Sequence, residues 1–169
     1  MLGQIKLVIF DVDGVLTDGR IILDSNGVET KFFHVRDGTG IKFLMRAGVE
    51  VALITGRESE VVSLRARDLG IKHVYQKCLE KGRAFDDLLG KLGVKPGEVC
   101  CVGDDVHDIP MMRRCGFAVA VKDAPDEVRK FAHYVTRAAG GCGAAREVAD
   151  LIIKARGRWA VVVGKYSQG

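Results

Sequence analysis

The fold is decided near the start of the chain by the stretch Leu7-Val8-Ile9-Phe10-Asp11-Val12-Asp13-Gly14-Val15-Leu16-Thr17-Asp18. An apolar run leads there directly into two carboxylates that are separated by a single residue. A charge at the edge of a protein core has to be paired, hydrogen-bonded or bound to a metal. Residues i and i+2 of an extended chain point the same way, so the sequence predicts that Asp11 and Asp13 address one site.

Length and composition favour one folded domain over residues 1–169. Of the 169 residues, 47% are hydrophobic and only three are prolines, so the chain can bury a core. We expect no membrane partner, because no apolar stretch approaches the ~20 residues that span a bilayer. The net charge of +4 is too small to indicate nucleic acid and suits a small anionic substrate. The first apolar run ends in acids, unlike a signal peptide, and the five cysteines lack zinc-binding spacing, so we expect a cytoplasmic protein.

Short apolar strands alternate with amphipathic helices along the chain. The predicted strands are 5–10, 49–54, 73–75, 99–102, 118–121 and 134–136. The predicted helices are 37–47, 59–69, 85–92, 110–115, 126–132 and 144–155. This alternation predicts an α/β fold with a doubly wound, Rossmann-like parallel sheet that is covered by helices on both faces.

One segment, about 19–35, interrupts this alternation. Two β-rich pieces, 20–23 and 29–35, flank Asp24-Ser25-Asn26-Gly27, and Asn-Gly strongly indicates a hairpin. We interpret it as a small insertion, too small to form a cap domain. Its apolar side chains favour contact with another subunit, with packing on its own domain as the alternative; they are Ile21, Ile22, Phe32 and Phe33. The tail, about 157–169, is predicted to add a strand or to dock on a neighbour.

Polar residues follow three of the predicted strands where each strand ends. They are Asp11 and Asp13; Thr55, Gly56 and Arg57; and Asp104, Asp105 and Asp108. In open parallel sheets, ligands bind beyond the carboxyl ends of the strands, so we expect these residues to meet at one edge. So many carboxylates cannot all stay ionised in one place without a cation, and oxygen ligands without histidine indicate Mg²⁺. One carboxylate can then attack a phosphoryl group, while Thr55 and a lysine hold its oxygens.

These residues carry a resemblance to the haloacid dehalogenase superfamily of phosphatases with an aspartate nucleophile. The motifs are D-x-D-G-V-L-T-D at the start, T-G-R after the second strand and G-D-D-x-x-D-I-P after a later strand. With HVRDGTGIKFL, VAVKDAP and the glycine loop before GAAREV, they resemble the 3-deoxy-D-manno-octulosonate 8-phosphate phosphatase family over about residues 5–155. The resemblance implies a phosphorylated sugar acid as substrate, in the synthesis of a lipopolysaccharide precursor, and a homotetramer with hairpins at the subunit interface.

The resemblance also implies a role for each matching residue. Asp11 would be the nucleophile and a metal ligand, and Asp13 the general acid and base, with its backbone carbonyl on the metal. Thr55 and Gly56 would bind the phosphoryl group. Lys81 would neutralise it, and we prefer Lys81 to Lys77 because it opens the helix around 85–92. The remaining metal-side residues are Asp104 as a ligand, with Asp105 and Asp108 in or around the coordination sphere.

Two arginines and two other functions stay open at this point. Arg57 would contact the substrate or form a surface pair, and Arg146 would lie on the substrate side, although Cys142 stands where a polar residue is expected in the glycine loop. The first alternative is a phosphatase of a nine-carbon sugar-acid 9-phosphate of the sialic acid type. The second is a non-catalytic partner that assembles with a sugar-acid enzyme.

Overall fold

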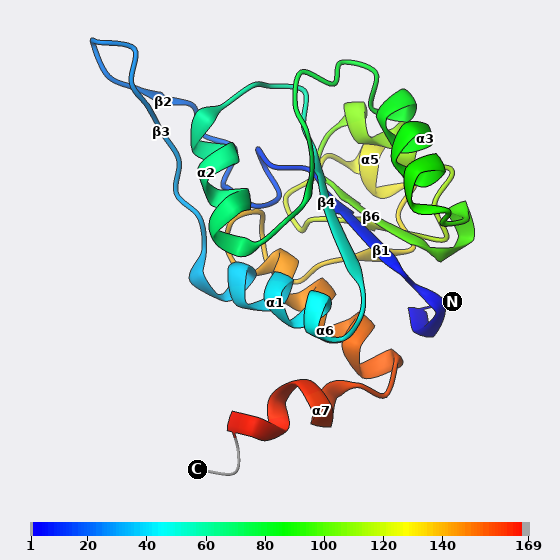
Figure 1. Ribbon diagram of the computed structural model, residues 1–169. Coiled ribbons are helices and arrows are strands. Elements are labelled where there is room, and N and C mark those ends of the chain that lie inside the picture. Colours follow the sequence, from blue (N-terminus) through cyan, green and yellow to red (C-terminus); the bar gives the residue numbers. More distant parts are fainter. Residues whose placement is uncertain (1, 167–169) are drawn as a thin grey trace.

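A parallel sheet forms the centre of the protein in the computed structural model, which describes residues 2–166 (Figure 1). Within those residues the sheet has six strands in the order β5-β4-β1-β6-β7-β8, and every neighbouring pair is parallel. The strands are β1 Leu7–Phe10, β4 Glu50–Ile54, β5 His73–Tyr75, β6 Val99–Gly103, β7 Phe117–Ala120 and β8 Tyr134–Val135. The observed sheet confirms the predicted fold class.

The central position of β1 explains why its sequence is apolar throughout. All four residues of the strand are buried, because β4 and β6 flank it and helices cover both faces. Phe10 pairs with Leu53 of β4 and with Val102 of β6. The three strands therefore end side by side, and the residues that follow them emerge at the same edge of the sheet.

Helices cover both faces of the sheet. One face carries α1 Val35–Arg46, α2 Glu60–Leu69 and α6 Ala144–Ala155 (Figure 1). The other carries α3 Lys81–Leu92, α4 Ile109–Met112 and α5 Asp126–Arg129. The predicted amphipathic character of the helix around 85–92 is confirmed in α3, since Phe85 and Leu88 are fully buried and Leu89 nearly so. Short 3₁₀ helices occupy Leu2–Gln4, Pro96–Glu98, Val106–Asp108 and Gly164–Tyr166.

The start of α1 differs from its prediction for an electrostatic reason. The helix begins at Val35, two residues before the predicted start at residue 37, and His34 caps it through a ring nitrogen that accepts from the Arg36 amide. Asp37 is instead buried in the first turn, where its carboxylate accepts the amide protons of Gly143 and Arg146 at 3.2 and 2.7 Å. A carboxylate at the beginning of a helix is favourable, and Asp37 serves the start of α6 in this way.

The predicted hairpin is present, with shorter strands. It consists of β2 Ile22–Leu23 and β3 Glu29–Thr30, and the chain from residue 31 to residue 34 is extended without being paired. Ile21 and Phe32 are exposed as expected. Phe33 is a correction, because it packs against the hydrophobic core instead of lying on the surface.

The tail is helical, which contradicts the predicted strand. Residues Trp159–Val163 form α7, and Val162 is buried against the domain. The Tyr166 hydroxyl accepts a hydrogen bond from Arg46 of α1 at 2.7 Å, so the described part of the tail docks on its own chain. Residues 167–169 lie outside the described residues.

Of the helices that the structure describes, not one combines the length and the apolar character needed to cross a lipid bilayer.

The glycine loop before α6 packs directly on the segment that follows β1. The Gly141 amide donates to the Val15 carbonyl at 2.9 Å. A Cβ atom on Gly140 would lie 1.7 Å from the Gly14 carbonyl oxygen, which is far inside van der Waals contact. Only glycine permits this approach, because the obstacle is backbone and cannot turn aside. The loop therefore supports the segment that carries Asp13.

We predict that Gly140→Ala destabilises the protein by about 1–3 kcal/mol, the usual cost of overpacking a tightly packed contact. Gly90→Ala is a matched control, because Gly90 lies in α3 and an added Cβ would contact nothing. That control is expected to gain about 0.5–1 kcal/mol from the better helix propensity of alanine. Urea unfolding of both variants measures the difference, and equal stabilities would show that the loop does not pack as described.

Candidate active site

The three polar strand ends meet in one cavity of about 340 Å³ at the carboxyl edge of the sheet. Its lining consists of Asp11, Asp13, Thr55, Gly56, Arg57, Cys78, Leu79, Lys81, Asp104, Asp105, His107 and Asp108. The residues after β1, β4 and β6 thus come together as the sequence pattern predicts, and Arg146 is the sequence-predicted residue that lies elsewhere.

The centre of the site is an ammonium group between two carboxylates. Lys81 opens α3, and its side chain is only 4% exposed. Its Nζ lies 2.8 Å from Asp11 Oδ1 and 2.6 Å from Asp108 Oδ1. Burial lowers the pKa of Lys81, but Asp11 and Asp108 outweigh it and hold the pKa above its usual value, so the lysine stays charged. Lys77, the other candidate, is exposed and pairs with Glu58.

Asp108 supports this arrangement with both of its oxygens. While Oδ1 faces Lys81, Oδ2 accepts the amide protons of Asp104 at 3.0 Å and Asp105 at 3.3 Å. Asp108 is buried, and it locks the turn after β6 in the process. Asp105 is exposed, and its side chain caps the same turn by accepting the Val106 amide at 2.7 Å.

Asp104 lacks the contact with Lys81 that compensates the charges of Asp11 and Asp108. Its Oδ1 is buried and has no hydrogen-bond partner among the described residues. Burial, and then the charges of Asp11 and Asp108, raise the pKa of Asp104 to about 8. Burial and Asp108 likewise raise the pKa of Asp11 to about 6, although Lys81 opposes this. One lysine therefore does not balance the negative charge that the three carboxylates would carry.

This excess of carboxylate fits a bound divalent cation. Asp11, Asp104 and Asp108 each offer an oxygen within 4.8 Å of the others. An unsatisfied buried oxygen beside ionisable carboxylates is costly without a cation, and an all-oxygen donor set suits Mg²⁺. Because both oxygens of Asp108 are already engaged, Asp11 and Asp104 are the side chains best placed to bind the ion.

The second carboxylate of the opening motif lies apart from this cluster. Asp13 Oδ1 accepts from Lys31 Nζ at 2.5 Å, and Oδ2 lies 3.8 Å from Arg57 Nε. Its side chain is 18% exposed and lines the cavity. Asp11 and Asp13 thus line one cavity but have different partners, Lys81 for Asp11 and Lys31 for Asp13.

The turn after β4 forms the opposite wall. Thr55 is buried, and its backbone is fixed by hydrogen bonds with Tyr75 and Cys78. A Cβ on Gly56 would approach only the Cys78 carbonyl, at 3.9 Å, so Gly56 is not required there for packing. Arg57 lies at the rim, where its side chain is 42% exposed and pairs with Glu29.

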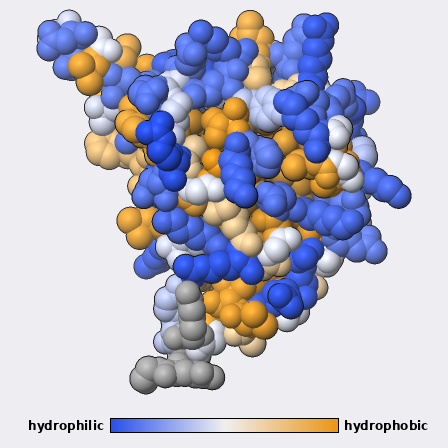
Figure 2. Space-filling view, in the orientation of Figure 1, coloured by the Kyte–Doolittle hydropathy of each residue, from blue (hydrophilic) through white to orange (hydrophobic). Residues whose placement is uncertain are grey.

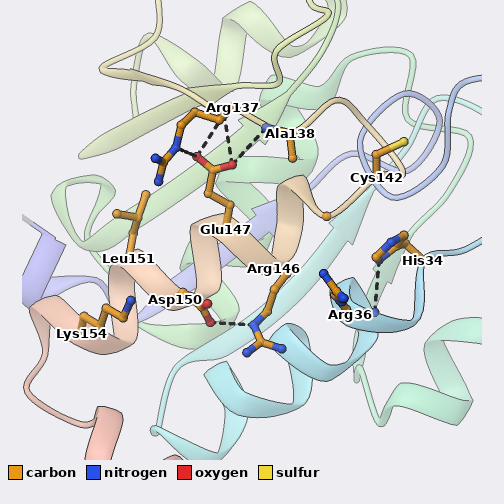
Figure 3. Close-up of a pocket in the computed structure, with 11 residues that line it drawn as sticks. His34, Arg36, Arg137, Ala138, Cys142, Arg146, Glu147, Asp150, Leu151 and Lys154 are labelled. Carbon is orange, nitrogen blue, oxygen red and sulfur yellow. Dashed lines mark hydrogen bonds and ion pairs between the residues drawn. The ribbon is translucent and has the colours of Figure 1, made fainter.

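Arg146 belongs to a different cavity, of about 370 Å³, beside α6. Figure 3 shows its side chain next to Asp150, with which Nε forms an ion pair at 2.7 Å. Its guanidinium also lies over the Phe43 ring. Cys142 lines the same cavity, away from Asp11. The structure therefore does not bring Arg146 to the phosphoryl site of its own protomer.

Two functional candidates escaped sequence reasoning, namely Lys31 and Glu29 on the hairpin. Both contact residues of the cavity wall, and Ser59 donates to Glu29 as well. A lysine and a glutamate in a short hairpin resemble ordinary surface residues. The available signal was their spacing, since residues 29 and 31 lie on the same side of an extended chain.

Comparisons with known proteins agree with this geometry. The family model for haloacid dehalogenase-like hydrolases matches residues 68–146. The chain is 51% identical over 155 residues to a 3-deoxy-D-manno-octulosonate 8-phosphate phosphatase, KdsC, of Escherichia coli K12, covering 92% of this chain and 82% of that protein. It is 46% identical over 160 residues to KdsC of Haemophilus influenzae, covering 95% and 89%.

A solved structure shows the same fold throughout. The 3-deoxy-D-manno-octulosonate 8-phosphate phosphatase of Moraxella catarrhalis, in complex with magnesium, phosphate and KDO, superimposes with a TM-score of 0.95 at 40% identity. The match covers 98% of this chain and 95% of that one. With two curated relatives near half identity over most of their length, the chain belongs to the 3-deoxy-D-manno-octulosonate 8-phosphate phosphatase family of haloacid dehalogenase-like hydrolases.

Proposed function

We propose that this protein is a Mg²⁺-dependent phosphatase that hydrolyses 3-deoxy-D-manno-octulosonate 8-phosphate to the free sugar acid and phosphate, for lipopolysaccharide precursor synthesis. The observation that carries the proposal is the buried cluster of Asp11, Asp104 and Asp108 around Lys81 at the end of the central strand. The names of the curated relatives and the magnesium, phosphate and KDO of the Moraxella catarrhalis complex support it.

In the first half of the reaction, Asp11 is the nucleophile. A carboxylate oxygen of Asp11 attacks phosphorus, the bond between phosphorus and the sugar oxygen breaks, and its electron pair goes to that oxygen. The protonated carboxyl of Asp13 delivers its proton there, so the sugar leaves as an alcohol. Lys81 keeps the nucleophile oriented through its 2.8 Å contact and neutralises charge on the transferring group.

In the second half, water hydrolyses the aspartyl phosphate. Asp13, now a carboxylate, accepts a proton from the water as its oxygen attacks phosphorus. The bond between phosphorus and Asp11 breaks, and the electron pair returns to the Asp11 carboxylate. Thr55 and Gly56, on the opposite wall, hold the phosphoryl oxygens, and Arg57 at the rim contacts the sugar acid.

Asp11, Asp104 and the Asp13 backbone carbonyl would hold Mg²⁺, with Asp108 locking the turn behind them. When bound, the ion supplies positive charge to the phosphoryl oxygens and polarises phosphorus. Asp104 is the residue whose buried oxygen most needs that cation.

Assembly into a homotetramer through the hairpins is part of this proposal. The exposed apolar side chains of the hairpin region are Ile21, Leu23, Val28, Phe32 and Val35. Figure 2 shows the hairpin projecting from the domain, with hydrophobic residues beneath a hydrophilic tip. An isolated two-stranded hairpin is marginal in water, so burial of these side chains between subunits would stabilise it.

We predict Mg²⁺-dependent phosphate release from a panel of sugar-acid phosphates, with the eight-carbon substrate preferred over nine-carbon 9-phosphates. Asp11→Asn should lower kcat/KM by at least about 10³-fold, because removal of a nucleophile removes the covalent route. Phosphate release measured with each substrate tests both points. No turnover of any member by metal-loaded protein would disprove the function, whereas preference for nine carbons would change only the substrate.

We predict that Mg²⁺ stabilises the protein against heat, and more at pH 8 than at pH 6. Ligand at about 100 times its dissociation constant adds ~2.7 kcal/mol to the free energy of unfolding. The pKa of about 8 means that Asp104 holds a proton more often at pH 6, and Mg²⁺ must then displace it. Asp104→Asn should abolish the stabilisation, whereas Asp68→Asn, on an exposed carboxylate, should keep it. An equal effect in both variants would exclude Asp104 as a ligand.

We predict a tetramer by light scattering at micromolar concentration. Phe32→Asp should produce smaller species, because it places a charge where an apolar side chain, 68% exposed in the protomer, would be buried. Val135→Asp is the control, since Val135 is also exposed but lies on β8 at the far edge of the sheet. A monomeric wild type would remove the hairpin interface from the proposal.

A further inference from the structure

Residues 29–32 form the root of the hairpin, and their side chains point alternately toward the domain and away from it. Glu29 and Lys31 face the domain, where Lys31 has only 1% of its side chain exposed. Thr30 and Phe32 between and beyond them are exposed, Phe32 by 68%. This period of two is that of an extended chain, and it continues two residues past the end of β3, to Phe32. The hairpin therefore has a charged inner side as well as an apolar outer side.

The inner side brings the buried ammonium group of Lys31 to Asp13. Lys31 Nζ lies 2.5 Å from Asp13 Oδ1 and 3.3 Å from Glu29 Oε1. Removing an ammonium group from water is costly unless carboxylates compensate it, and these two do so. Lys31 is absent from the lining of the cavity, whereas Asp13 is part of it, so Lys31 acts on the site through Asp13.

Glu29 in turn is clamped to the opposite wall of the site. Its Oε1 lies 3.2 Å from Arg57 Nη2, and its Oε2 accepts from the Ser59 hydroxyl. The hydrogen bond from Ser59, together with Lys31 and Arg57, lowers the pKa of Glu29, so it remains a carboxylate. The hairpin root thus bridges the segment after β1 and the turn after β4, and Lys31 is held from both sides.

We propose that Lys31 is a positioning residue that holds the carboxyl group of Asp13 in the orientation in which it meets the departing sugar oxygen. An ammonium group only donates hydrogen bonds, so the oxygen bonded to Lys31 must be an acceptor. Oδ1 is that oxygen, so the contact with Lys31 leaves Oδ2, which lies 3.8 Å from Arg57 Nε at the cavity rim, as the oxygen available to the substrate. This inference rests on the proposed function, in which Asp13 protonates the departing sugar oxygen.

The leaving group of the substrate separates this role from simple support of the hairpin. A sugar alkoxide needs a proton in order to leave, whereas nitrophenolate and acetate are stable anions that leave without one. A misplaced general acid therefore harms the first class and spares the second. Loss of folded protein lowers turnover of both classes alike, and loss of the Arg57 contact with the sugar acid raises the KM of the first class without lowering its kcat. The parameter kcat/KM covers the steps up to phosphoryl transfer to Asp11, and its ratio between two substrates does not depend on the fraction of active enzyme.

The experiment compares kcat/KM for 3-deoxy-D-manno-octulosonate 8-phosphate with that for 4-nitrophenyl phosphate and acetyl phosphate. Lys31→Met should lower the first about 10- to 100-fold, the usual cost of misplacing a catalytic group. The other two should fall less than about 3-fold, as expected where the acid is not needed. Lys31→Arg should restore most of the loss, because it returns a cationic donor to Oδ1.

Two further variants make the outcome decisive. Glu29→Gln keeps Lys31 but weakens the ion pair that holds it. It should therefore lower kcat/KM for the sugar-acid phosphate more than for the other two substrates, by a smaller factor than Lys31→Met. This variant tests the proposal even if Lys31→Met does not fold. Thr30→Ala, on the exposed side of the same strand, should leave both substrate classes unchanged. Equal losses on both classes in Lys31→Met and Glu29→Gln, or no loss on either, overturn the proposal for Lys31. A wild type that releases phosphate from none of the substrates overturns the proposed function instead.

Discussion

The site depends on a local excess of negative charge that the fold holds at the end of its central strand. Asp11, Asp104 and Asp108 crowd around the single ammonium group of Lys81. Such crowding opposes folding, because each buried carboxylate resists ionisation beside the others. A divalent cation turns the same arrangement into a favourable one. The cluster therefore links the ends of two strands, β1 and β6, and the start of α3 to the chemistry of a phosphate ester.

Glycine makes this crowding sterically possible. A Cβ on Gly14, whose φ is +98°, would lie 2.1 Å from Asp104 Oδ2, and one on Gly103 would lie 2.4 Å from Asp108 Cβ. The segment after β1 can approach Asp104 so closely because Gly14 lacks a side chain, and the turn after β6 can fold back over Gly103 for the same reason. Gly140 extends the same packing outward to the loop before α6. The glycine loop thus acts on the site through backbone packing, and this explains its presence without a contact between Arg146 and the phosphoryl group.

The sequence allowed the parallel sheet and the meeting of its strand ends to be predicted, because apolar periodicity and strand direction are local properties. Lys81 was preferred to Lys77 from its place at the start of a helix, and the structure brings it to Asp11. Local patterns could not predict contacts made by segments outside the sheet and the helices that cover it. Lys31 lies in a hairpin whose approach to Asp13 is a tertiary event, and the run Trp159–Val163 has strand propensity but packs as a helix against its own domain. Tertiary packing overrode local preference there.

Asp11 and Asp13, the two carboxylates that we propose carry the chemistry, are held by lysines from different kinds of scaffold. Lys81 holds Asp11 from a helix packed on the core, so the proposed nucleophile is positioned by the folded domain itself. Lys31 holds Asp13 from a hairpin of two-residue strands, which is marginal by itself and exposes Phe32 on its outer side. If subunits cover that outer side, assembly stabilises the inner side as well, because adjacent residues of one extended chain cannot move independently. Assembly would then favour proton transfer by Asp13 and leave the attack by Asp11 unaffected. The position of the hairpin next to Asp13 would thereby serve catalysis.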